Sequence, residues 1–183
     1  MSVIEAHRFN GVKWKRFARR VGYATALLPA SVGAIGAVAV GRPDTARRWW
    51  ARISETEASS RQPSAPRLLA HALLSIPLGL LSLIPIGIEI LFVLRGILYP
   101  LVDHGPYTHS WGGPSVGGAW LAHFAISLPF AAAGLGALWI LGQWHSRLTG
   151  GTWGHKVGLV PVLALVPVLG AAAMLVIAWT HQL

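Results

Sequence analysis

Four long apolar segments alternate with polar or basic segments along the chain, and this pattern predicts its elements. The apolar segments cover residues 21–40, 68–102, 119–142 and 157–180. Because about 20 apolar residues suffice to cross a bilayer core, each segment is long enough to form a membrane-spanning helix. We therefore predict an all-α fold, a polytopic integral membrane helical bundle with about four transmembrane helices.

The central segment, 68–102, is the one around which the rest is organised. Leu68 to Ile88 contains no formal charge, whereas the remainder carries Glu89 and Arg95, and prolines interrupt the whole segment. Prolines kink a membrane helix without abolishing it when neighbours satisfy the freed carbonyl groups. We interpret 68–102 as one long, kinked and tilted helix, with two short helices in a hairpin as the alternative.

The polar segments define the domain organisation. Residues 1–20 form a basic N-terminal arm, and residues 21–183 form a single transmembrane domain that includes the basic connector 41–67. Trp14 and Phe17 would share one face of an interfacial amphipathic helix, although a solvated basic tail explains the arm equally well.

Charge predicts orientation and excludes one class of partner. The chain has 15 Lys and Arg against six Asp and Glu, and most of the basic residues flank the first apolar segment. Cytoplasmic retention and attraction to anionic lipid explain this charge without nucleic acid. The loop 103–118 has no Lys or Arg and is predicted outside, whereas 143–156 carries Arg147 and Lys156 and is predicted inside.

The two basic segments create a conflict for the first apolar segment. Both favour the cytoplasm, yet a spanning helix over 21–40 would separate them. This segment is rich in Ala and Gly with Pro29 in its middle, and we favour spanning over re-entry. Re-entry of 21–40, a hairpin at 68–102, or an external basic segment would each resolve the conflict.

Two groups of charged residues are candidate sites. Arg47, Arg48 and Arg52 lie beside paired tryptophans and predict a basic patch that binds anionic lipid at the membrane surface. Ionisable residues inside membrane segments are costly and are functional candidates by default. Glu89, Arg95 and His123 therefore form a candidate intramembrane polar cluster, with a structural ion pair or a neutral Glu89 as the simpler explanations.

No residue pattern predicts a metal, a cofactor or catalysis. Asp103, His104 and His109 have side chains that suit zinc, but their spacing fixes no ligand set. His71 and His123, which could suggest haem ligation, are predicted near opposite membrane faces. The chain contains no cysteine, and we find no catalytic triad, phosphate-binding loop or paired carboxylates. We therefore predict that the protein is not an enzyme.

Residues about 67–150 resemble the sensor domain found in actinobacterial membrane proteins, often ahead of a histidine kinase. The motifs that carry the resemblance are RLLAHALLSIPLGLLSL, the dipeptide Tyr99-Pro100, SWGGPSVGGAW and a basic WHSRLTGG. The resemblance implies a four-helix module of the cell membrane that passes a signal to an output domain. Here a further apolar segment, 157–180, stands where an output domain is expected.

The resemblance implies a non-enzymatic, multi-pass membrane module that resembles a stand-alone sensor domain and acts through a partner. That partner would be another membrane protein or a second copy of the chain, in addition to the lipid bilayer. The alternatives are an accessory subunit of a larger membrane complex and a small transporter or channel component.

Overall fold

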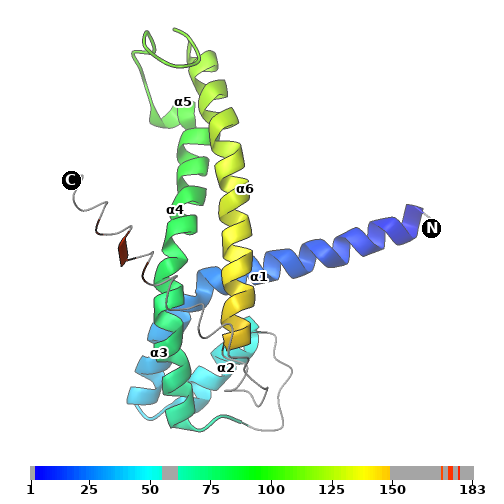
Figure 1. The fold of residues 1–183 in the computed structure, drawn as a ribbon, viewed down its shortest axis with the longest axis vertical. Coiled ribbons are helices and arrows are strands. Elements are labelled where there is room, and N and C mark those ends of the chain that lie inside the picture. Colours follow the sequence, from blue (N-terminus) through cyan, green and yellow to red (C-terminus); the bar gives the residue numbers. More distant parts are fainter. Residues whose placement is uncertain (1–2, 55–61, 149–169, 171–172, 175–176, 178–183) are drawn as a thin grey trace. The chain divides into compact units, whose positions relative to one another are not determined.

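The computed structural model describes residues 3–54 and 62–148, together with a few isolated helical positions between 170 and 177 (Figure 1). The described elements are α1 (Val3–Ala39), α2 (Pro43–Ser54), α3 (Ala65–Leu81), α4 (Leu83–Leu91), the π-helix η1 (Phe92–Ile97), α5 (Tyr99–Val102) and α6 (Val116–Leu148). Among the described residues, three helices are long and apolar enough to cross a membrane: Lys13–Ala39, Ala65–Ile97 and Val116–Leu148. The all-α prediction is confirmed, while most of the predicted fourth span, 157–180, lies outside the described residues.

Helix α1 joins the basic arm to the first apolar segment without a break at residue 20. Trp14 and Phe17 lie on one face of this helix and stack with ring centroids 5.5 Å apart. After α1 the chain reverses at Gly41, whose φ of 73° is the left-handed conformation that glycine adopts most readily. The amphipathic helix α2 then begins at Pro43.

The predicted central segment forms one helix from Ala65 to Ile97, so the hairpin alternative is wrong. At the α3–α4 junction Ser82 keeps a right-handed helical conformation, and its N–H donates to the carbonyl of Leu78. Farther on, the Leu98 N–H donates to the carbonyl of Val93, five residues earlier, at 2.8 Å. That spacing is the hydrogen bond of a π-turn, which is often found at functional sites.

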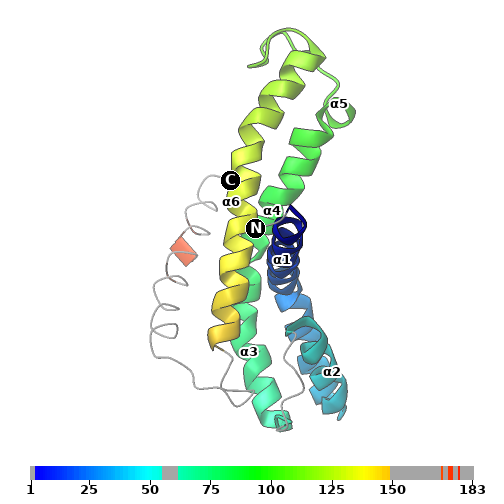
Figure 2. The same cartoon turned by 90° about the vertical axis from the view of Figure 1, so that its right-hand side faces the viewer.

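The described chain divides into two compact units. Unit 1 consists of residues 1–82 and 141–183, and unit 2 of residues 83–140. In unit 1, α1 packs chiefly against α3 and also against α2, which lies beside the C-terminal half of α1 in both views (Figures 1 and 2). A Cβ on Gly79 would lie 2.8 Å from the backbone nitrogen of Leu28, so α1 and α3 approach each other backbone to backbone. Small residues permit such close helix contacts in membranes.

Unit 2 pairs α4 and η1 with the first part of α6. Phe92 and Phe124 pack with ring centroids 5.9 Å apart, and Gly96 approaches the hydroxyl of Ser127. The connection from α5 to α6 closes on itself at Gly112 and Gly118, where a Cβ on either residue would overlap the backbone of the other. This contact gives a physical reason for the glycine-rich SWGGPSVGG sequence, because only glycine fits at both positions.

Candidate functional site

A cavity of about 380 Å³ lies in unit 2, between the α5–α6 connection and the first turns of α6. Its chemistry comes from aromatic, imidazole and carboxyl side chains, namely Tyr99, Asp103, Tyr107, His109, Trp111 and His123. We call this cavity the loop pocket. Its volume falls within the range of about 300–1,000 Å³ that is usual for small-molecule sites.

Hydrogen bonds around Asp103 shape the wall of the loop pocket. One carboxylate oxygen of Asp103 accepts the Gly105 N–H at 3.0 Å, and the Asp103 carbonyl accepts the Tyr107 hydroxyl at 2.6 Å. These bonds fold the chain back directly after α5, as aspartate side chains commonly do in turns. The tyrosine ring is thereby held beside the carboxylate.

A stacked pair of rings also lines the loop pocket. Tyr99 and His123 stack with centroids 4.2 Å apart and planes 21° apart. Nδ1 of His123 lies 2.8 Å from the carbonyl oxygen of Ala119. Because a carbonyl oxygen can only accept, Nδ1 of His123 carries a proton and donates it to Ala119.

The loop pocket combines an ionised carboxylate with a neutral phenol. The hydrogen bond from the Gly105 N–H holds the pKa of Asp103 below its usual value. The Tyr99 hydroxyl and the positive charge of Arg95 lower it further, by smaller amounts. Burial, together with the hydrogen bond and charge of Asp103, raises the pKa of Tyr99 above its usual value. At neutral pH the pocket wall therefore carries a negative charge at Asp103.

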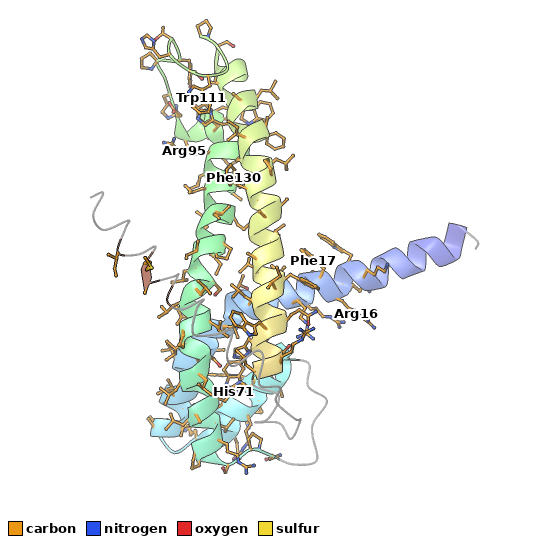
Figure 3. The ribbon with its side chains drawn as sticks, in the orientation of Figure 1. Arg16, Phe17, His71, Arg95, Trp111 and Phe130 are labelled. Carbon is orange, nitrogen blue, oxygen red and sulfur yellow. The ribbon has the colours of Figure 1, made fainter. Side chains whose placement is uncertain are left out.

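Unit 1 contains a second candidate site, a buried polar network to which four helices contribute. The side chains are Tyr23 from α1, Trp50 from α2, His71 and Ser75 from α3, and His145 from α6, each no more than 5% exposed. Trp50 meets His71 edge to face at 4.3 Å and lies nearly parallel to His145 at 6.0 Å. Figure 3 labels His71 at the place in unit 1 where these helices meet.

The hydrogen bonds of the buried polar network assign the tautomer of His145. Ser75 donates its hydroxyl proton to the carbonyl of His71 at 2.6 Å. The serine oxygen must therefore accept at its 2.6 Å contact with His145, so Nε2 of the imidazole carries the proton. Nδ1 then accepts from the Tyr23 hydroxyl, also at 2.6 Å. A neutral His145 is thus satisfied on both sides inside an apolar helix bundle.

Sequence reasoning did not find this network. His145 fell in the segment 143–156, which was predicted to be a cytoplasmic loop, but α6 continues to Leu148 and buries the side chain completely. The available signal was on α3, where His71 and Ser75 are four residues apart and therefore share one helix face. Two polar residues on one face of an otherwise apolar helix point to a common partner.

No hydrogen bond or ion pair joins Glu89, Arg95 and His123 among the described residues, so their intramembrane cluster stays a prediction. Oε1 of Glu89 lies against α6, at 2.5 Å from the position of a Cβ on Gly134, and the backbone of Leu135 is a hydrogen-bonding neighbour of the carboxylate. Arg95 is exposed, and His123 belongs to the loop pocket. Glu89 lies on α4, Arg95 on the π-helix η1 and His123 on α6.

The other histidines suggested by the sequence are separated in the same way. His109 lines the loop pocket, whereas His104 is exposed and is not part of its wall. Within residues 3–54 and 62–148, no three His, Cys, Asp or Glu side chains converge as a metal site would require. His71 and His123 belong to different units.

The predicted basic patch on α2 is only partly available to a membrane surface. Arg47 forms an ion pair with Asp44, donates from Nε to the carbonyl of Pro63 at 2.9 Å, and is largely covered. Arg48 and Arg52 are exposed, and Arg48 donates to the Thr45 hydroxyl at 3.0 Å. The exposed pair therefore carries most of the surface charge of the patch.

Comparisons of this chain with protein-family models, with curated proteins and with solved structures give no match. The loop pocket and the buried polar network are accordingly the observations from which a function can be inferred.

Proposed function

We propose that the protein is a non-enzymatic, multi-pass module of the cell membrane that binds a small ligand in the loop pocket and acts through a partner protein. The observation that carries the proposal is the pocket itself. It is a cavity of small-molecule size whose wall combines aromatic rings with one carboxylate and two imidazoles. Such a mixture, with few polar groups placed among apolar ones, is typical of ligand sites.

The path from ligand to partner in this proposal runs along α6. The same helix supplies His123 to the loop pocket and His145 to the buried polar network. A ligand that contacts His123 can shift an equilibrium only if it binds two conformations with different affinity. In the proposal, the hydrogen bonds of His145 distinguish those conformations, and a partner membrane protein or a second copy of the chain reads them.

The proposal is tested by ligand-induced stabilisation of the full-length protein in detergent. A library of neutral, anionic and cationic small molecules is screened for compounds that raise the melting temperature. Each compound is then retested on Ala122→Phe, which fills the pocket from α6, and on Ala125→Phe, at an exposed position on the same helix that does not line the pocket. Stabilisation lost only in Ala122→Phe supports the ligand site.

The same variants distinguish the other functional classes. If no compound stabilises the wild-type protein, or if Ala122→Phe responds like the wild type, the ligand-binding proposal is wrong. Co-purification of a fixed set of respiratory or transport subunits, unchanged by Ala122→Phe, would instead indicate an accessory subunit. Solute flux through liposomes containing the purified protein would indicate a transporter or channel component.

A further inference from the structure

We infer that the ligand of the loop pocket is a small organic cation, a substituted ammonium compound held by Asp103 and the aromatic rings. This inference rests on the proposed function and specifies the chemical class of its ligand. It depends on the charge of the wall, on the kind of rings that surround that charge, and on the position of the nearest cation.

The charge of the pocket wall is negative. Asp103 is the acidic side chain among the described residues that line the cavity, and no Lys or Arg is among them. The Gly105 N–H and the Tyr99 hydroxyl donate to this carboxylate, and no ion pair to a basic side chain is found for it in the described chain. A carboxylate without a paired cation, at the edge of a concave site, favours a positively charged ligand.

Aromatic rings surround the carboxylate. Tyr107 lies beside Asp103, its hydroxyl bonded to the Asp103 carbonyl, and Trp111 is 85% exposed at the rim. One face of Tyr99 is covered by His123, and the Tyr107 ring lies near Tyr99 with centroids 6.4 Å apart, so Trp111 is the ring of the lining most accessible to a ligand. Aromatic faces attract ammonium groups, and Trp does so most strongly. An indole that is exposed at the rim of a cavity is well placed to close over such a group.

Arg95 provides an internal test of the electrostatics. It does not line the cavity, yet its charge is close enough to contribute to the lowered pKa of Asp103. Figure 3 labels Arg95 and Trp111 at the same end of unit 2. If the ligand is a cation, Arg95 opposes binding while Asp103 favours it. Neutralising the two residues should therefore change the affinity in opposite directions, which a purely structural role of either would not produce.

The experiment measures binding to the full-length protein in detergent by calorimetry. Choline is the cationic probe, 3,3-dimethylbutan-1-ol is its uncharged counterpart of the same shape, and isobutyrate is the anionic probe. We expect choline to bind at least tenfold more tightly than the alcohol and isobutyrate not to bind. Asp103→Asn, which keeps an acceptor for the Gly105 N–H, should weaken choline binding about tenfold, whereas Arg95→Gln should strengthen it about threefold at low salt.

Paired variants separate ring contacts from general damage. Trp111→Leu should weaken choline binding by about 2- to 30-fold, the range of a single cation–π contact. Trp120→Leu removes an exposed indole from α6 outside the pocket and should leave binding unchanged. Circular dichroism and melting temperature identify any variant that is misfolded. The change in choline affinity caused by Arg95→Gln is then compared with the change caused by Glu89→Gln, which neutralises an acidic residue outside the pocket.

The outcomes for the ligand class and for the proposed function are distinguishable. Equal binding of choline and the alcohol, or equal effects of the Asp103 and Arg95 variants, would overturn the cation assignment. If library compounds of another class still bind in a manner that Ala122→Phe abolishes, the ligand-binding function survives and only the class is wrong. If no compound of any class shows that pattern, the proposed function itself fails.

Discussion

The Tyr23 hydroxyl lies 2.6 Å from Nδ1 of His145, a buried contact between helices α1 and α6 across 122 positions of sequence. The other ring nitrogen of His145 meets Ser75 on α3 at the same distance. One imidazole thus connects three helices of unit 1. The contact is buried, so loss of either partner removes a hydrogen bond from a site without water contact, which is the costly case.

Tyr23→Phe should lower the stability of the protein in detergent by about 1–2 kcal/mol, because it removes the donor to Nδ1 while keeping the ring. Thermal unfolding followed by circular dichroism measures the change. Thr25→Val is the matched control, since the Thr25 hydroxyl is exposed and bonds only to the Gly22 carbonyl within α1. Equal melting temperatures for the two variants would contradict a stabilising hydrogen bond between Tyr23 and His145.

Gly79→Ala should destabilise unit 1 by about 1–3 kcal/mol, the usual range for overpacking. The added Cβ would lie 2.8 Å and 2.9 Å from backbone atoms of Leu28, which cannot rotate away. Gly87→Ala is the control in the same long helix, where nothing described lies within 4 Å. That substitution should be neutral or stabilising, because Ala favours helix over Gly by up to about 1 kcal/mol. A milder effect at Gly79 than at Gly87 would show that α1 and α3 do not approach as described.

Glu89→Gln and Arg95→Gln should have additive effects on stability, within about 0.5 kcal/mol, because the two side chains make no direct contact. The double variant and both single variants are compared by thermal unfolding at one pH. A parallel cycle with Tyr23→Phe and His145→Gln, whose side chains are in contact, should show clear coupling. Coupling of similar size between Glu89 and Arg95 would restore the predicted polar cluster.

Arg48 and Arg52 should account for most of the affinity of α2 for anionic lipid, at about 1 kcal/mol each near a charged surface. The measurement is the rise in melting temperature when phosphatidylglycerol is added to the protein in neutral detergent. Arg48→Gln with Arg52→Gln should remove most of this rise, and salt should weaken it in the wild type. Arg47→Gln, at a covered position, should leave the lipid-induced rise nearly intact. A rise that ignores salt and all three arginines would exclude the basic patch as a lipid site.

Ser110 should be outside the cell and Ser146 inside. The prediction follows from the absence of Lys and Arg in residues 103–118 and from Arg147 in the last turn of α6. Because the natural chain has no cysteine, Ser110→Cys and Ser146→Cys can be labelled individually with an impermeant thiol reagent. Intact cells should label the first variant, and permeabilised cells should label both. Labelling of Ser146→Cys alone in intact cells would reverse the orientation.

The sequence by itself determined the class of the fold. The long apolar segments with few charges suit a bilayer, where no water is available to the backbone N–H and C=O groups. Helices satisfy these groups within each segment. The same reasoning favoured one helix over 68–102, which the structure bears out from Ala65 to Ile97. These properties depend on residues close together in the chain, so a local pattern is sufficient to predict them.

Only the tertiary structure decided which polar residues meet. Helical periodicity gives the face of a residue, but its partner depends on where two helices cross, and that is set by close contacts such as Gly79 against Leu28. For this reason His145 lies at the centre of a buried network, and Glu89 packs against a glycine and not beside Arg95. Long-range packing fixes these pairings, because each depends on residues far apart in the sequence.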